Sequence, residues 1–145
     1  MLIELKGMGS KALHANKETI LKACKQHDIT SVCIVYCGGV NSGLTDFISV
    51  EPAIDKEALE QIKPIVKTRR FDAASYSIVL EDQEVTLHQA VSTLTKAILN
   101  LYEPEWQLDK GSVGELSIDV AKDHVKLNHT CFNKEATEST NELEL

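Results

Sequence analysis

The chain has 145 residues, 43% of them hydrophobic, and a formal net charge of −7. This length favours a single domain, large enough to bury roughly two thirds of the surface that the unfolded chain exposes. The acidic balance argues against a general nucleic-acid binder. No apolar run approaches the ~20 residues needed to span a bilayer, and the N-terminus lacks the basic and apolar regions of a signal peptide. We therefore expect a cytoplasmic protein that does not bind membranes.

The first segment predicts a strand and a helix. Leu2 to Leu5 are expected to form a short strand before a glycine turn, and Ser10 to cap a helix that ends near His27. Apolar residues lie along one side of this helix, and Lys17 intrudes at the edge of that side.

Next comes a predicted hairpin. The run 31–37, SVCIVYC, is apolar and β-branched throughout, which predicts a strand in the middle of a sheet with both faces buried. A glycine-rich connection at 38–43 leads into the run 44–50, in which Phe47 and Ile48 point to opposite faces. This order predicts a hairpin with a long loop.

The middle of the chain is less regular. Asp55 is expected to cap a helix that Pro64 kinks or divides and that ends in basic residues within 63–70. The short apolar run 76–80 is a candidate strand, and residues 81–84 are expected to form an acidic loop.

The strongest pattern begins at Thr86. Thr86 and Gln89 have the spacing of a capping box, and an apolar stripe then predicts a helix as far as residue 102. The alternation that follows predicts strands at 114–120 and 124–131 joined by a turn at 122–123. In the register that this turn sets, apolar residues face one another across the hairpin, with Ile118 opposite Leu127, Val120 opposite Val125, and Asp119 opposite Lys126 outside.

The order of a helix followed by a hairpin occurs twice, in residues 10–50 and 86–131. We therefore expect an α+β fold, in which two αββ units form an antiparallel sheet of about four strands with helices on one face. Residues 1–133 would make up this single domain, and residues 134–145 an acidic, flexible tail.

Two glycine-rich segments carry a resemblance. The runs 36–43, YCGGVNSG, and 106–114, WQLDKGSVG, resemble an uncharacterised bacterial family of unknown function. In that family an aromatic-x-Gly-x-Gly-Asp-Ser-Gly turn accompanies a Trp-Glu-x-Asn-x-Gly-x-x-Gly hairpin. The present chain has Asn41 where the family has Asp, and Gln107 where it has Glu. The resemblance covers about half of the chain and implies an architecture, but no activity.

Catalytic motifs are weak. Ser42 lies in the glycine-rich loop, but it lacks the Gly-x-Ser-x-Gly spacing of a nucleophile elbow and no helix follows it. A phosphate-binding loop would need Gly-Lys-Ser/Thr at the start of a helix. Asn41, Ser42 and Gly43 are residues that tight turns favour, so the sequence predicts no catalytic residue.

Metal ligands are also not predicted. Cys33 and Cys37 would lie about 13 Å apart on one strand, too far for one tetrahedral ion. His129 and Cys131 share a strand face but would need two further ligands, so a packed histidine is the better interpretation. We expect no metal and no cofactor, and we expect the four cysteines, Cys24 included, to be reduced thiols.

A partner site can be placed from the sequence. A lone tryptophan beside a hairpin often anchors the edge of a sheet, but it also suits an interface when carboxylates surround it. An aromatic anchor with an acidic rim fits a basic protein surface better than it fits chemistry. The predicted partner-binding residues are Trp106, Glu103, Glu105, Asp109, Asn41 and Ser42.

The leading hypothesis is therefore a non-catalytic protein-interaction module of unknown process, with a protein partner; a homodimer is compatible with it. One alternative is a phage- or plasmid-encoded inhibitor of a host or defence protein (anti-CRISPR-like), which small size and acidity would suit. Another is a small enzyme or nucleotide binder that uses the loop 38–43.

Overall fold

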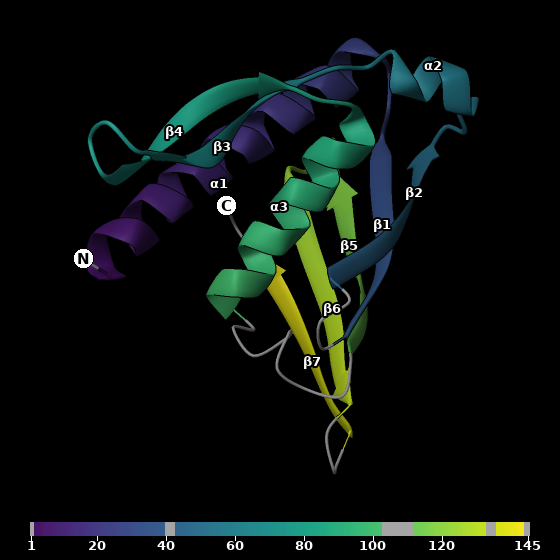
Figure 1. The fold of residues 1–145 in the computed structure, drawn as a ribbon. Helices are drawn as coiled ribbons and strands as arrows, with labels where there is room; N and C mark the ends of the chain where they lie inside the picture. Colours follow the sequence, from purple (N-terminus) through teal and green to yellow (C-terminus); the bar gives the residue numbers. More distant parts are fainter. Residues whose placement is uncertain (1, 40–42, 103–111, 133–135, 144–145) are drawn as a thin grey trace.

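The computed structural model describes residues 2–39, 43–102, 112–132 and 136–143. Within them no helix is long and apolar enough to cross a bilayer. Figure 1 shows the arrangement of the elements. In chain order they are α1 (Leu2–Gln26), β1 (Ser31–Gly39), β2 (Gly43–Glu51), α2 (Lys56–Glu60), β3 (Ile65–Asp72), β4 (Ser77–Glu84), α3 (Leu87–Tyr102), β5 (Ser112–Asp119), β6 (His124–Phe132) and β7 (Ala136–Leu143).

The main sheet has five strands in the order β2-β1-β5-β6-β7, and every neighbouring pair is antiparallel. Strands β3 and β4 form a separate hairpin. The predicted α+β fold is confirmed, since α1-β1-β2 and α3-β5-β6 are two αββ units that share one sheet. Strand β1 has a neighbour on each side, as the apolar run 31–37 predicted.

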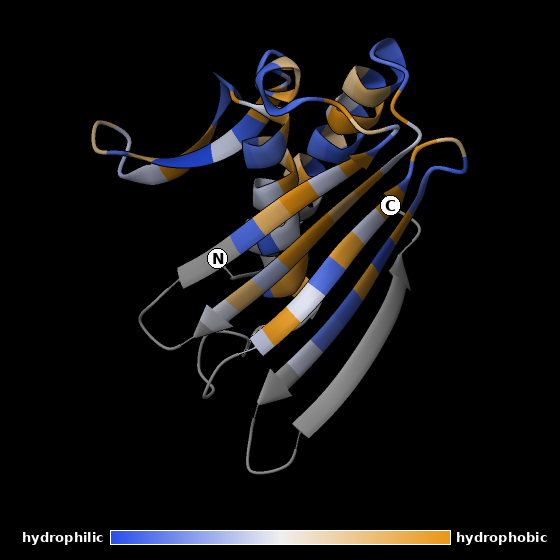
Figure 2. Cartoon of the chain, turned by 90° about the vertical axis from the view of Figure 1, so that its right-hand side faces the viewer, coloured by the Kyte–Doolittle hydropathy of each residue, from blue (hydrophilic) through white to orange (hydrophobic). Residues whose placement is uncertain are grey.

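Helices α1 and α3 lie on the same face of the main sheet (Figure 1), and Figure 2 shows the opposite face in front of them. On β1, β5 and β6 the described side chains of the helix-bearing face are buried, and those on the other face are half-buried or exposed. We call this second face the open face. The prediction that both faces of β1 are buried is therefore wrong, because Val32, Ile34 and Tyr36 are buried whereas Val35 is 50% exposed.

Helix α3 forms as its sequence predicts. The backbone N–H of Thr86 donates to Oε1 of Gln89 at 3.0 Å, and the backbone N–H of Gln89 donates to Oγ1 of Thr86 at 3.2 Å. This reciprocal pair satisfies two N–H groups that the first turn leaves without helical partners. Burial of each large apolar side chain contributes about 1.5–3 kcal/mol. The buried apolar residues of α3 are Leu87, Ala90, Val91, Leu94, Ile98 and Leu99.

The β5–β6 hairpin has the predicted strands in a register shifted by two residues. Ile118 pairs with Val125 and Leu116 with Leu127, so Ile118 does not lie opposite Leu127. The connection is four residues long instead of two, and Asp123 takes a left-handed conformation with φ 54°. An even shift keeps every side chain on its predicted face, because side chains alternate along a strand. The apolar pattern could therefore fix the face but not the pairing.

Three segments differ from the sequence prediction. Helix α1 begins at Leu2, where a short strand and a glycine turn were predicted. A glycine within a helix costs only about 1 kcal/mol relative to alanine, so it need not end one. Helix α2, capped by Asp55 as predicted, ends at Glu60, and residues 65–72 form β3 instead of a helical end. Pro64 disfavours helical backbone at the residue before it, and Ile, Val, Thr and Phe favour the strand.

The predicted acidic loop 81–84 is part of β4. Its carboxylates lie beside basic residues of β3, and the ion pairs Lys67–Asp82 and Arg70–Glu81 have N–O distances of 2.8 and 2.7 Å. All four side chains are substantially exposed, so these pairs contribute little to stability and mainly favour one pairing of the strands.

The C-terminal segment also differs from the prediction. A flexible tail was expected at 134–145, whereas residues 136–143 form strand β7, paired antiparallel with β6. The segment is polar, as a strand at the edge of a sheet can be when it borders solvent. Composition alone favoured a tail because it gives no account of backbone pairing.

The β3–β4 hairpin is held to α1 by an amide. The Asn16 side chain donates to the backbone carbonyl of Lys67 at 3.0 Å and accepts from the backbone N–H of Lys67 at 2.7 Å. Val66 is fully buried at the base of the hairpin, whereas four large apolar residues are exposed: Ile65, Phe71, Tyr76 and Ile78.

Candidate functional site

The residues predicted to bind a partner all lie outside the described residues: Trp106, Glu103, Glu105, Asp109, Asn41 and Ser42. The strand ends that carry them are described. Gly39 pairs with Gly43, and Gly38 pairs with Ser112. The segments 40–42 and 103–111 are therefore joined to the main sheet at the same end of β1, β2 and β5.

An exposed apolar cluster lies on the open face and reaches this end. Val35 pairs with Phe47 across β1 and β2, and Cys37 pairs with Val113 across β1 and β5. Phe47 is 74% exposed, Val35 50% and Val113 39%. We call these four residues the open-face patch. The sequence analysis did not select them, although the alternation in 44–50 already placed Phe47 opposite the core residue Ile48.

Acidic residues border the open-face patch. Glu115 pairs with Val35 in the register of β1 and β5 and is exposed. The Cys33 thiol donates to Oε2 of Glu115 at 4.0 Å. Burial and then the Glu115 carboxylate raise the pKa of the Cys33 thiol, and a hydrogen bond with Ser117 opposes them. Asp119 lies farther along the same face of β5 and is half-buried.

Beyond β5 the open face is polar. Strand β6 contributes Lys126, Asn128 and Thr130 at positions paired with Ser117, Glu115 and Val113. The open-face patch is therefore confined to β2, β1 and the start of β5. These strands meet the segments 40–42 and 103–111 at one end of the sheet.

A second surface lies beside β2. A groove of about 850 Å³ is bordered by β2, α2 and the first turn of α3, and we call it the β2 groove. The half-buried side chains of Ile48, Ile54 and Leu59 line it. Nε2 of His88 on α3 lies 2.6 Å from Oδ1 of Asp46 on β2. This contact joins the helix to the edge of the sheet.

The Asp46–His88 pair resembles part of a hydrolytic triad, in which a histidine activates a nucleophile by accepting its proton through a hydrogen bond. Thr86, Ser92 and Thr93 line the β2 groove or its continuation. In the described part of the chain, however, no hydroxyl or thiol forms a hydrogen bond with His88. The contact that the structure does show connects β2 to α3.

The histidine that was considered as a zinc ligand is packed inside the sheet, as predicted. The Tyr36 hydroxyl and His129 Nδ1 are 2.6 Å apart, their rings are stacked with centroids 5.8 Å apart, and each residue is 1% exposed. Both pair with Gly114, from opposite sides of β5. A Cβ at Gly114 would collide with the Tyr36 hydroxyl and lie 2.5 Å from the Asn128 carbonyl oxygen. Glycine therefore allows Tyr36 and His129 to meet across the intervening strand.

Among the described residues, no three histidine, cysteine, aspartate or glutamate side chains lie close enough together to hold a metal ion. Cys24, Cys33 and Cys37 are free thiols. Cys131 and its neighbourhood lie outside the residues whose side chains are described.

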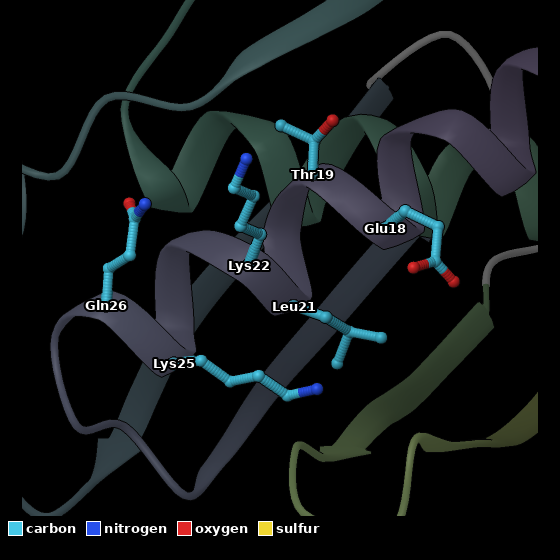
Figure 3. A pocket seen from close by; sticks show the side chains of 6 residues that line it. All are labelled: Glu18, Thr19, Leu21, Lys22, Lys25 and Gln26. Carbon is cyan, nitrogen blue, oxygen red and sulfur yellow. The ribbon is translucent and has the colours of Figure 1, made fainter.

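A hollow of about 590 Å³ lies along α1. All of its lining residues belong to that one helix, and Figure 3 shows that the amines of Lys22 and Lys25 point in different directions. A ligand site needs polar groups that converge on one point. The hollow is therefore a depression in the surface of the helix and not a candidate site.

These features define an α+β protein with an open sheet face and a groove at one sheet edge, without an assembled catalytic centre in the described residues. The chain matches the model of a family of unknown function, DUF6878, over residues 12–143. It therefore belongs to that family. Comparison with curated proteins found no match, and neither did comparison with solved structures.

Proposed function

We propose that this protein is a non-catalytic protein-interaction module that binds a basic surface of a partner protein through the open-face patch and the adjoining loops. The observation that carries the proposal is Phe47, a large aromatic residue that is 74% exposed on the open face of the edge strand β2. Interface hot spots are enriched in aromatic residues that are exposed in the free protein and buried in the complex.

The carboxylates around the open-face patch favour a partner with a basic surface. Glu115 borders the open-face patch, and Glu51 and Asp119 lie at the far end of the same face, against one lysine, Lys126. The loop 103–111, which joins the sheet at the near end, contributes three more carboxylates in the sequence. Apolar contacts would supply affinity, and the carboxylates would steer a cationic surface toward them and fix its orientation.

The test is affinity capture from cells of the source organism, with the protein as bait and quantitative mass spectrometry as the readout. Phe47→Ser should reduce capture of the partner by at least thirtyfold, since truncation of an aromatic hot spot costs about 2 kcal/mol or more. Its effect on the free energy of unfolding should stay within about 0.5 kcal/mol because the side chain is largely exposed.

Tyr76→Ser is the matched control. Tyr76 is 85% exposed but lies on the β3–β4 hairpin, away from the open face, so its loss should leave capture unchanged. Trp106→Ala combined with Glu105→Lys should abolish capture, scored on variants with a native-like melting profile. Undiminished capture by Phe47→Ser would refute the assignment of the surface.

The same experiment separates this proposal from the enzyme hypothesis. Ser42→Ala should leave partner capture nearly intact, because the loop serine is assigned no chemistry. Loss of a measurable hydrolytic or nucleotide-binding activity in Ser42→Ala would favour a small enzyme instead.

A further inference from the structure

Strand β2 is the edge of the main sheet next to the β2 groove. It spans Gly43–Glu51, 9 residues, on the order of 30 Å at the rise of a strand. Within the described ranges, only β1 pairs with it. An edge strand directs every second pair of its backbone N–H and C=O groups outward, where they can bind another strand. The side chain of Ser49 on this strand is exposed.

The β2 groove follows this edge on the helix-bearing side of the sheet. It continues into a smaller hollow of about 350 Å³, and the two share Asp46, His88 and Gln89. A strand added to β2 would direct alternate side chains toward the groove. These alternate side chains would contact Ile48, Ile54 and Leu59, which pack against the core but are only half-buried. An edge strand beside a groove that a helix borders is a common geometry for the binding of extended peptides.

The charges around this groove are mainly positive. Lys56 and Lys63 line the groove and Lys96 lines its continuation, whereas Glu60 is the opposing carboxylate that is not in an ion pair with a described residue. The remaining carboxylate, Asp46, is already paired with His88. This balance favours an acidic ligand and contrasts with the acidic open face.

We propose that the β2 edge binds an extended segment of a partner protein whose groove-facing residues, every second one along the segment, are apolar or acidic. The segment pairs with the β2 backbone as a sixth strand. Its groove-facing apolar side chains contact the apolar lining of the β2 groove, and its groove-facing acidic side chains approach the three lysines. The β2 groove shares Phe47 with the open-face patch but has the opposite charge, so variants at Val35 and at the lysines distinguish this proposal from the function proposed above. A second copy of the chain fits less well, because pairing of β2 with β2 would bring the lysines of two grooves toward one seam.

The probe is a pool of peptides of the same length as β2, in which every second residue is either apolar or glutamate and the intervening residues are small and polar. A matched pool has lysine in place of glutamate, and a third has the glutamate sequences with N-methyl groups on alternate amides. We expect the purified protein to retain glutamate peptides, with the lysine pool bound at least tenfold more weakly. N-methylation should abolish binding because it removes the donors that pair with a strand.

Variants then test the site. Lys56→Glu combined with Lys63→Glu should weaken the selected peptide about tenfold, the equivalent of roughly 1.4 kcal/mol. Lys122→Glu, a charge reversal in the distant β5–β6 connection, should leave binding unchanged. Val35→Ser on the open face should also leave peptide binding unchanged, whereas the double lysine variant should still capture the open-face partner.

Three outcomes would overturn the proposal. They are the absence of any bound glutamate peptide at about 1 mM, the weakest affinity of interest; equal binding of the N-methylated peptides; and a dimer of the peptide-free protein that the double lysine variant strengthens. The first excludes the ligand, the second excludes strand pairing, and the third assigns the edge to a second copy.

Discussion

Gly114→Ala should be among the most damaging single-methyl changes in the main sheet. The added Cβ would collide with the Tyr36 hydroxyl and lie 2.6 Å from Tyr36 Cζ and 2.5 Å from the backbone carbonyl oxygen of Asn128. Contacts this short force the neighbours to move. The Asn128 carbonyl belongs to the backbone of β6 and has little freedom, so Tyr36 must shift away from His129.

The magnitude follows from two contributions. Overpacking of a close-packed interior costs about 1–3 kcal/mol. Weakening the buried hydrogen bond between Tyr36 and His129 costs about 1–3 kcal/mol more. We expect a loss of about 2–6 kcal/mol in the free energy of unfolding, which for a chain of this size corresponds to a fall in Tm of roughly 5–20 °C.

Urea denaturation followed by far-UV circular dichroism measures this loss. Val113→Ala is the control, because Val113 is the neighbouring residue but lies 39% exposed on the open face. Tyr36→Phe supplies a double-mutant cycle. Without the hydroxyl, Gly114→Ala should cost at least about 1 kcal/mol less than in the wild-type background. A Gly114→Ala protein within about 0.5 kcal/mol of wild type would show that the sheet accommodates the methyl and would refute the reasoning.

Three further predictions concern the core, metals and the thiols. Leu94→Asp should unfold the domain, since it buries a charge at a fully buried position of α3, and a cooperative melt at the wild-type midpoint would disprove this. Dialysis against a chelator should leave the Tm unchanged, and stoichiometric zinc lost together with the fold would contradict it. Iodoacetamide in mildly alkaline buffer should modify exposed Cys37 first and Cys33 more slowly, because burial and Glu115 raise the pKa of Cys33. Burial raises the pKa of Cys24 to about 11, so mass spectrometry should detect its modification only after unfolding; equal native rates for Cys24 and Cys37 would refute this.

Sequence patterns predicted the long helices and strands that bury only one side. The α3 stripe and the alternating strands of both hairpins follow directly from which side chains must leave water. The same patterns could not predict the length of the β5–β6 connection. A register shift of two residues leaves every side chain on the same face of the sheet, so both registers fit the pattern. The patterns also could not identify β3 or β7. These strands have mixed or polar sequences, and it is pairing with a neighbouring strand that accounts for them.

Some features of the candidate site could likewise be predicted from the sequence, and others could not. The sequence located the glycine-rich connections, and the register of Gly38 with Ser112 places their strand ends together. It did not locate the open-face patch, because Val35 lies in a continuous apolar run and Phe47 in an alternating one, and neither pattern shows which face of the sheet the helices leave open. The β2 groove was beyond prediction, since it forms only when α3 packs beside β2 and α2, which lie far from α3 in the sequence.

The attachment of the β3–β4 hairpin has a consequence for how this family can vary. Asn16 bonds to the main chain of Lys67, so the contact is indifferent to which side chain stands at that position. Proline is the exception, since it has no N–H to donate. Beyond this anchor the outer half of the hairpin can change its sequence while the domain beneath keeps its own. Residues such as Phe71 and Tyr76 could therefore be replaced, in evolution or by design, to change the surface of the hairpin without changing the rest of the domain.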